Sequence, residues 1–193
     1  MSRIKKQSNY FYWLCWFFIV SVNLLFLFAM TNQSESNFDW SLIRSEIRDS
    51  ISIVEKYNRI TSGVIGMNGI TPAQYYTRLW LMQNVDKTEV VLLTGHPNSV
   101  VKATAYETLL RKANGNPFEL IQKTLKDTTT IIHYQSGCIG EPKILGEYLV
   151  EDVLRLSFRE LKHEKLTKIQ KDTVLFMYKK LNANKWKYIN QYY

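Results

Sequence analysis

Cysteine and histidine are scarce in this chain, and their scarcity excludes several classes of protein. The 193 residues include two cysteines, Cys15 and Cys138, and three histidines. Two cysteines so far apart form neither a disulfide framework nor a C-x-x-C metal pair. The histidines are widely separated and have no carboxylate at ligand spacing, so we predict no metal site and no cofactor.

The catalytic motifs that the chain approaches are incomplete. His163–Thr167 begins like the zinc motif H-E-x-x-H, but Thr167 stands where the second histidine is needed. We therefore interpret this segment as a solvated helix face. The best catalytic pair is Cys138 with His133, a thiol and a base five residues earlier in the chain. This pair leaves open an alternative function, a small thiol-dependent hydrolase.

Glycine is also rare, and three of the eight glycines lie in Ser62–Gly69. Their spacing is G-x-x-G-x-x-G, without the Lys-Ser/Thr pair or the G-x-G of phosphate-binding loops. We interpret this segment as a turn between helices. The next segment, Thr71–Gln74, has the pattern of a helix capping box with proline at the first helical position.

Apolar residues recur at helical spacing along most of the chain after residue 38. They mark predicted helices at Ile43, Ile47, Ile51 and Val54; at Tyr75, Leu79 and Met82; at Leu120, Ile121 and Leu125; at Leu145, Leu149, Val153 and Leu156; and at Leu166, Ile169, Thr173, Phe176 and Met177. Period-2 alternation is almost absent, so the sequence predicts an all-α fold. The β-branched run Asp127–Ile132 disfavours a helix, and Gly137–Pro142 is predicted to be a loop.

The stretch Glu89–Asp127 organises the rest of the prediction. A short helix ends at Gly95, the chain turns through Pro97, and a second helix begins at Ser99. This second helix has so wide an apolar arc that we expect it to pack between neighbouring helices. The residues predicted to face water on it are Thr104, Glu107, Thr108 and Arg111.

The run His96–Leu109 resembles the inter-helix turn and second helix of a HEAT repeat. Val101, Lys102, Ala105 and Leu109 take the positions of the repeat's apolar and basic residues, and a shift of about 31 residues aligns Val100-Val101 with Ile131-Ile132. The run also resembles uncharacterised bacterial HEAT-like proteins. The resemblance implies a short α-solenoid of antiparallel helix pairs, and no activity comes with it. We predict separately that such a module binds another protein. The predicted partner-binding residues are Lys102, Arg111 and Lys112.

Residues 10–30 carry no charge and are long enough, at 1.5 Å per residue, to span roughly 30 Å of bilayer. Arg3, Lys5 and Lys6 precede them, which predicts a single-pass inner-membrane anchor with the bulk of the chain outside the cytoplasm. The alternative is a cleaved signal peptide and a secreted or periplasmic protein. Its best cleavage site, after Ala29, has the bulky Leu27 at the −3 position.

The net charge of +8 is concentrated at the two ends of the chain. The basic, aromatic C-terminal segment is predicted either to bind anionic lipid or an envelope polymer, or only to solvate a terminal helix. Nucleic acid is the least favoured partner, because the predicted topology places this segment outside the cytoplasm. The residues predicted for lipid or polymer binding are Lys179, Lys180, Lys185, Trp186 and Lys187.

The sequence therefore predicts four parts: a basic N-terminus (1–9), a transmembrane signal-anchor (10–30), a linker (31–38) and a HEAT-like helical domain (39–193). We predict a non-catalytic binding or scaffold module of the bacterial cell envelope.

Overall fold

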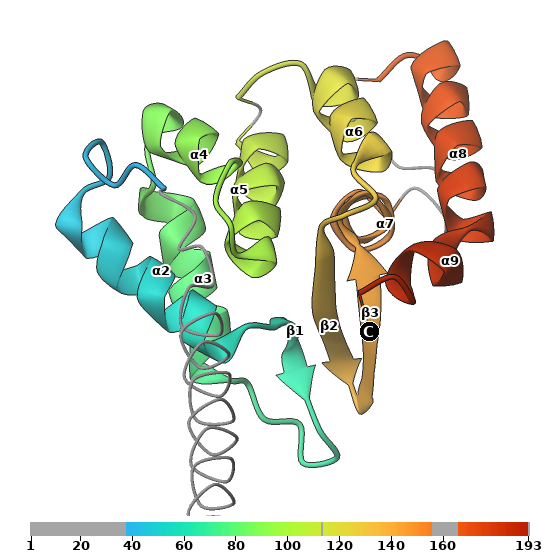
Figure 1. Ribbon diagram of the computed structural model, residues 1–193. Coiled ribbons are helices and arrows are strands. Elements are labelled where there is room, and N and C mark those ends of the chain that lie inside the picture. The colour runs from blue at the N-terminus through green and yellow to red at the C-terminus, as the bar shows by residue number, and fades with distance from the viewer. Residues whose placement is uncertain (1–37, 113, 156–165, 193) are drawn as a thin grey trace, which may run out of the picture. The chain divides into compact units, whose positions relative to one another are not determined.

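The computed structural model describes residues 38–112, 114–155 and 166–192, which belong to one compact unit, Phe38–Tyr193. The described residues form a mixed α/β fold rather than the predicted all-α solenoid (Figure 1). The elements in chain order are α2 (Ser45–Tyr57), β1 (Ile60–Ile65), α3 (Ala73–Asn84), α4 (Lys87–Leu93), α5 (Ser99–Arg111), α6 (Pro117–Lys126), β2 (Ile131–Gly137), β3 (Ile139–Ile144), α7 (Leu145–Tyr148), the π-helical turn η1 (Leu149–Val153), α8 (Lys168–Ala183) and α9 (Lys185–Ile189).

Helix α5 lies at the centre of the fold and contacts α2, α3, α4, α6, β2 and η1. Figure 1 shows α2, α3 and α4 on one side of it and α6 to α9 on the other. Ile47, Ile51 and Val54 of α2 are buried, as the apolar stripe predicted. The break between α4 and α5 is also confirmed, because Asn98 caps α5 by accepting hydrogen bonds from the backbone N–H groups of Val100 and Val101.

A three-stranded sheet is what the all-α prediction missed. Strand β1 runs parallel to β2, and β2 pairs with β3 in an antiparallel hairpin. The strands come from segments that the sequence predicted as an inter-helix turn (Ser62–Gly69) and a loop (Gly137–Pro142). They are short, and Gly63 within β1 leaves room for the ring of Tyr75, which would lie 3.3 Å from an added Cβ.

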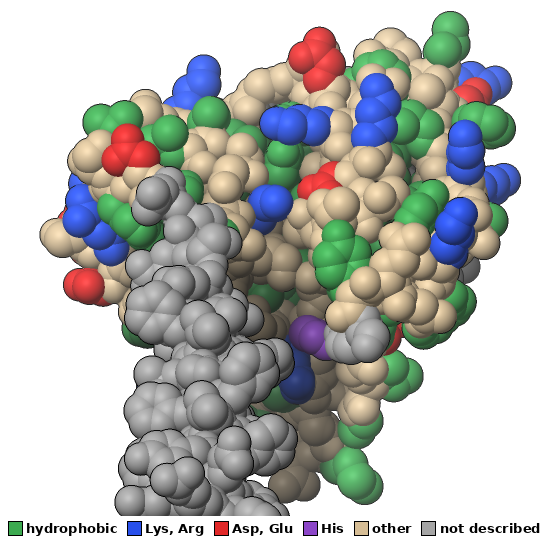
Figure 2. All heavy atoms as spheres, viewed as in Figure 1, with side chains coloured by type: hydrophobic (Ala, Val, Ile, Leu, Met, Phe, Trp, Pro, Cys, Tyr) green, Lys and Arg blue, Asp and Glu red, His purple; other side chains and the backbone are tan. Residues whose placement is uncertain are grey.

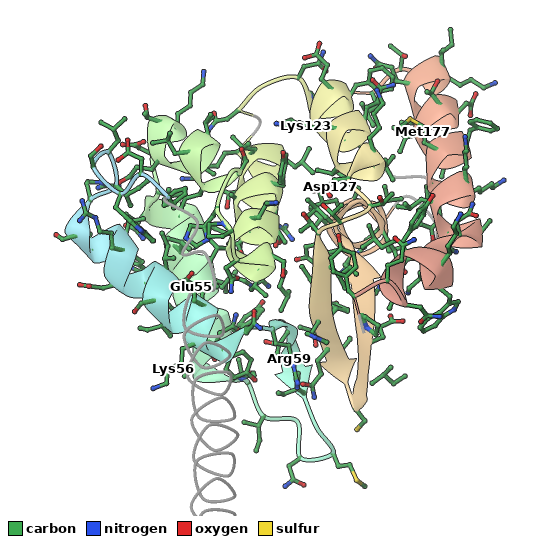
Figure 3. All side chains as sticks on the ribbon, viewed as in Figure 1. Glu55, Lys56, Arg59, Lys123, Asp127 and Met177 are labelled. Atoms are coloured by element: carbon green, nitrogen blue, oxygen red, sulfur yellow. The ribbon has the colours of Figure 1, made fainter. Side chains whose placement is uncertain are left out.

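The second copy of the predicted repeat is absent from the described residues. Ile131 and Ile132, which the 31-residue shift aligned with helical Val100 and Val101, belong to strand β2. Asp127 ends α6 by accepting hydrogen bonds from the backbone of Thr129 and Thr130, which turns the chain into this strand (Figure 3). The predicted solenoid of HEAT-like helix pairs is therefore wrong, although α4 and α5 are helices joined by a turn as predicted.

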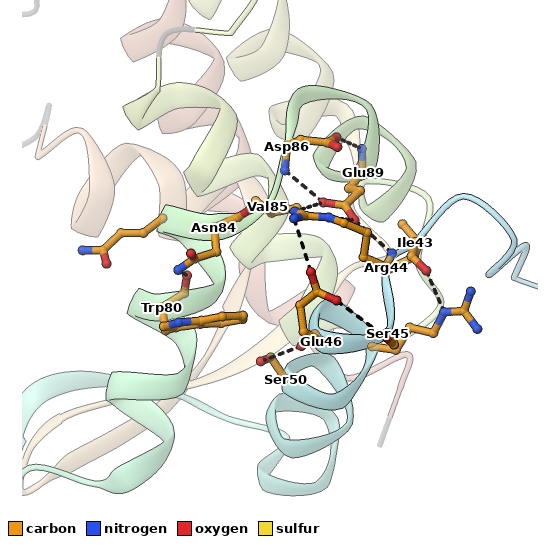
Figure 4. Close-up of polar contacts among 12 residues, drawn as sticks. Ile43, Arg44, Ser45, Glu46, Ser50, Trp80, Asn84, Val85, Asp86 and Glu89 are labelled. Carbon is orange, nitrogen blue, oxygen red and sulfur yellow. Dashed lines mark hydrogen bonds and ion pairs between the residues drawn. The ribbon is translucent and has the colours of Figure 1, made fainter.

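The start of α3 differs from its predicted form, and the capping box lies at the start of α4. Thr71–Gln74 makes no capping box: Pro72 is the N-cap, and Gln74 turns inward to the carbonyl of Arg59. Asp86 and Glu89 form a capping box on α4 instead, and Glu89 also holds the Arg44 guanidinium at 2.8 Å (Figure 4). Arg44 reaches the carbonyl of Asn84 as well, so this group fastens the start of α2 to the end of α3.

No helix among the described residues is long and apolar enough to cross a membrane. The predicted transmembrane segment, residues 10–30, lies outside the described part of the chain, as do the basic residues before it and the predicted linker up to residue 37. The signal-anchor prediction therefore receives no support from the structure.

Candidate functional site

Helices α3 and α5 bring together two buried charges that the sequence places 29 residues apart. Arg78 Nη1 of α3 donates to Glu107 Oε2 of α5 over 2.5 Å, and both side chains are almost fully buried. Tyr148 of α7 donates its hydroxyl to the same carboxylate over 2.7 Å. The sequence prediction placed Glu107 in water, whereas it lies at the junction of three helices. A buried carboxylate needs such partners, because an unpaired one would cost several kcal/mol or more.

The protonation states follow from this geometry. Burial raises the pKa of Glu107, but the charges of Arg78 and Arg111 and the Tyr148 hydroxyl outweigh it and leave the pKa below its usual value. Burial and the Glu107 charge raise the pKa of Tyr148 well above its usual value, so its hydroxyl stays a donor. The cluster therefore holds a carboxylate, a guanidinium and a neutral phenol.

Arg111 connects this buried cluster to the surface. Its Nε donates to Glu107 Oε1 over 2.7 Å, while the side chain is 56% exposed. No described residue pairs with its two terminal amino groups. Arg78 and Tyr148 fix the Glu107 carboxylate in place. The hydrogen bond from Arg111 Nε to this carboxylate therefore also fixes the orientation of the Arg111 guanidinium.

Arg111 lies at a cavity of about 340 Å³ between α3 and the end of α5, which we call the Arg111 pocket. Its lining residues are Tyr75, Leu79, Met82, Gln83, Thr108, Arg111 and Lys112. Lys112 donates its ammonium to the carbonyls of Gln83 and Val85, so it stiffens the rim and adds positive charge. The pocket thus combines an oriented guanidinium with apolar and aromatic walls.

Comparison of the chain with protein-family models, curated proteins and solved structures finds no match. Nothing in these comparisons identifies a HEAT-repeat family. The candidate site is therefore argued from its own residues.

The structure brings two of the three predicted partner-binding residues together and separates the third. Arg111 and Lys112 line the same pocket. Lys102 is half-buried on α5, where its ammonium donates to the Thr130 hydroxyl over 3.1 Å and joins α5 to the start of β2. Lys102 therefore takes part in a hydrogen bond within the fold and does not line the pocket that contains Arg111 and Lys112.

A second group of charges fastens the C-terminal helices to the sheet. Lys143 of β3 is buried and lies 2.8 Å from both Glu151 and Asp152. Burial lowers the pKa of Lys143, but hydrogen bonds to Asp152 and Glu151 outweigh it and raise the pKa above its usual value. Tyr178 of α8 makes a short hydrogen bond to Glu151. From helical spacing alone, Glu147, Glu151 and Asp152 are predicted to be solvated acidic groups on one helical surface. This prediction is wrong, because their partners Lys143, Tyr178 and Lys185 come from other segments.

Lys185, one of the residues predicted to bind lipid or polymer, belongs to this buried group. Its ammonium donates to Glu147 over 2.6 Å. Trp186 is 63% exposed, and the Lys185 ammonium lies 5.7 Å from its ring centroid. Lys179, Lys180 and Lys187 are exposed. The five predicted residues therefore divide into three surface lysines, one exposed tryptophan and one internal ion pair.

The structure does not bring the predicted thiol pair together. Cys138 is exposed in the two-residue turn of the β2–β3 hairpin, and Gly137 beside it has a φ of +55°. His133 lies within β2 opposite Pro142. Five residues of extended chain span roughly 16 Å, beyond proton-transfer distance. His163, of the incomplete zinc motif, lies outside the described residues.

Proposed function

We propose that this chain is a binding module that recognises a carboxylate next to an apolar side chain on a partner protein, and that the Arg111 pocket is the recognition site. The observation that carries the proposal is the Arg111 guanidinium: the buried Glu107 orients it through Nε, the side chain is 56% exposed, and Arg111 lines a pocket of about 340 Å³. A planar guanidinium fork matches a carboxylate in two parallel hydrogen bonds.

The charge balance favours a singly charged ligand. Glu107 is neutralised within the cluster by Arg78, which leaves the positive charges of Arg111 and Lys112 on the pocket wall. The ammonium of Lys112 already donates to two carbonyls, so one guanidinium supplies most of the free donors. A carboxylate needs no more than that, whereas a phosphate dianion would recruit more cations.

The apolar residues that line the Arg111 pocket indicate which kind of side chain lies next to the recognised carboxylate. Tyr75, Leu79 and Met82 present an aromatic ring, a branched aliphatic group and a thioether to the cavity. Aromatic residues, methionine and arginine are the side chains that protein interfaces favour. An apolar side chain beside the carboxylate would occupy this part of the pocket.

A peptide titration tests the proposal. The full-length chain is titrated with short blocked peptides that carry glutamate next to leucine, methionine or phenylalanine, and with the same peptides carrying glutamine. A charge-assisted hydrogen bond contributes about 1.5–3 kcal/mol, which is roughly ten- to a hundredfold in affinity. We therefore expect the glutamate peptides to bind at least about tenfold more tightly than the glutamine peptides.

Variants locate the effect. Arg111→Gln should abolish the preference for glutamate, and Arg111→Lys should keep part of it because the charge remains without the fork. Arg59→Gln is the matched control, because Arg59 contacts Gln135 away from the pocket and its loss changes the net charge equally. Equal affinity for the glutamate and glutamine peptides, or an unchanged preference in Arg111→Gln, would exclude this function.

A further inference from the structure

A second cavity lies between α6, α8 and α9, and it shares no lining residue with the Arg111 pocket. Its volume is about 350 Å³, and we call it the α6–α8 groove. It is lined by Leu125, Lys126, Thr128, Phe176, Met177, Lys180, Leu181 and Tyr188. Figure 3 shows Met177 on the side of α8 that faces α6.

The floor of the groove is apolar and firmly supported. Leu125 and Leu181 are buried in the hydrophobic core, and Met177 and Tyr188 pack against that core while remaining partly accessible. Phe176 is 71% exposed beside them. Phe176, Met177 and Tyr188 line the cavity together, and apolar side chains gathered in this way indicate an interaction site where a single exposed ring would not.

Positive charge surrounds this floor. Lys126 and Lys180 line the groove itself, and both are exposed. Figure 2 shows blue basic side chains over α6 and α8, and the basic residues of these two helices are all lysines. The exposed charges of α6, α8 and α9 are six lysines and two acids, Lys123, Lys126, Lys168, Lys179, Lys180, Lys187, Glu119 and Asp172.

The carboxylate next to Lys126 in the sequence already accepts hydrogen bonds within its own turn. Asp127, directly after Lys126, accepts hydrogen bonds from the backbone and hydroxyl groups of Thr129 and Thr130. Burial raises the pKa of Asp127, but these bonds outweigh it and hold the pKa below its usual value, so the carboxylate stays ionised. Among the described residues it makes no ion pair with Lys126, and its one charge offsets only one of the two lysines at the groove. The groove keeps a net positive rim around an apolar floor.

We propose that the α6–α8 groove docks an acidic amphipathic helix of a partner protein. Two or three apolar side chains on one face of such a helix would fill the cavity over Met177 and Leu181, as in helix-in-groove recognition. Glutamates or aspartates flanking that face would meet Lys126 and Lys180. This charge complementarity specifies an acidic partner and disfavours a basic one.

The shape of the site favours a protein partner over a lipid surface. A lipid headgroup layer is flat and is contacted by a row of cations and interfacial aromatics. Here the two lysines stand at a concave cavity, and Lys185 is held inside the protein by Glu147. A concave apolar cavity accepts protruding side chains, which a helix supplies and a headgroup layer does not. The groove would give the chain a second docking site, independent of the Arg111 pocket.

The probe is a helical peptide with leucine at positions i, i+3, i+4 and i+7 and glutamate on the flanks. A second peptide carries lysine in place of every glutamate, and a third keeps the glutamates but scrambles the leucines. Binding to the full-length chain is measured by fluorescence anisotropy. The Met177 ε-methyl resonance is followed in parallel, with Met67 as an internal control because it is exposed in a distant turn.

The expected result is binding of the acidic amphipathic peptide alone, together with a shift of Met177 but not of Met67. Lys126→Glu/Lys180→Glu should weaken that binding at least about tenfold, because two exposed ion pairs are lost and both become like-charge repulsions. The matched control is Lys56→Glu/Lys87→Glu, which changes the net charge equally at exposed sites on α2 and α4, away from the groove. This control should bind the peptide within about twofold of the unchanged chain, since it leaves every groove contact in place.

Three results would overturn the proposal. The first is equal binding of the acidic and basic peptides. The second is unchanged binding by Lys126→Glu/Lys180→Glu. The third is a Met177 shift that anionic phosphatidylserine vesicles produce and the acidic peptide does not, which would assign the surface to lipid instead.

Discussion

Helices α5 and α8 have similarly mixed compositions and differ in what surrounds them. Both mix apolar residues with charged and hydroxyl residues. In α5, even the polar residues Thr104, Glu107 and Thr108 are buried, whereas in α8, even Ile169 and Phe176 are exposed. The difference arises because six elements contact α5, whereas within the described part of the chain α8 packs chiefly against α6 and α7, with Tyr188 of α9 at the same groove. The neighbours of a helix, more than its composition, decide which residues it buries.

The comparison of α5 with α8 separates residues that stabilise the fold from residues that are available to bind a partner. The interior around α5 carries ion pairs that are costly to disturb, and it orients Arg111 from behind. The periphery at α8 carries apolar and basic groups that contribute little to folding, so they are available for a partner. Each of the following substitutions tests one side of this division.

Glu107→Gln should have the largest effect. Glutamine has nearly the same size, but it leaves the buried Arg78 guanidinium without a counter-charge, which costs about 3–5 kcal/mol. Chemical denaturation of the full-length chain measures the loss. The control is Glu46→Gln, which removes an exposed partner of Arg44 and should change stability by less than about 0.5 kcal/mol. Similar losses in the two variants would mean that Glu107 is not a buried counter-ion.

His96, just before α5, should make stability depend on pH. Burial, and then the charge of Lys102, lower its pKa from 6.5 to about 4. The unfolded state therefore binds this proton more readily, and stability falls as the pH drops from 6.5 towards 4. The difference between the unfolded and folded pKa values corresponds to a loss of roughly 3 kcal/mol in the free energy of unfolding at about pH 4.

Comparison with His96→Gln isolates this contribution. The variant should lack that part of the pH dependence, which a series of denaturation curves between pH 7 and 4 would show. Glu55, 3.7 Å from His96 Nε2, has a pKa that burial raises, so its protonation acts in the opposite direction in both proteins. Parallel stability curves for the two proteins would contradict the burial of a neutral His96.

Gly146→Ala should disturb the place where α7 meets α6. An added Cβ would lie 2.7 Å from the Leu125 Cα and 2.8 Å from the Thr124 carbonyl oxygen, and backbone atoms cannot move aside as a side chain can. We expect a loss of about 1–3 kcal/mol, as for overpacking in a core. Gly140→Ala is the control, because its nearest neighbour is 3.9 Å away. A melting temperature of Gly146→Ala equal to that of the control would show that the helices lie farther apart.

Phe176→Ser should have the smallest effect on folding. Its ring is mostly exposed on α8, so its loss should change stability by less than about 0.5 kcal/mol. Leu181→Ala, one turn further along the same helix but buried, should cost about 2–5 kcal/mol. If Phe176→Ser proved as costly as Leu181→Ala, α8 would have a second buried face and no groove.

The sequence predicted the parts of this fold that depend on local pattern. Ile47, Ile51 and Val54 recur at helical spacing, and the Gly95–Asn98 turn carries its own cap, so α2, α4 and α5 could be placed. The strands could not, because β1 pairs with a segment about seventy residues later and each strand is short.

Polar burial could not be predicted from the helix pattern either. Thr104 and Thr108 satisfy their hydroxyls by donating to the carbonyls one turn earlier, so they can be buried without any distant partner. Glu107 takes its partners from 29 residues before and 41 residues after it. A helical wheel shows neither arrangement. Of the candidate pocket, the sequence supplied Arg111 and Lys112 as cations, while Tyr75, Leu79 and Met82 were predicted only as core.

The most direct test is a methionine-methyl spectrum of the full-length chain titrated with the glutamate–leucine peptide. Met82 lines the Arg111 pocket, Met177 lines the α6–α8 groove and Met67 is exposed in a turn, so the three methyl groups report on three places. The account predicts a saturable shift of Met82 alone, which Arg111→Gln abolishes and Arg59→Gln preserves. A Met82 resonance that stays in place while the peptide binds would contradict it.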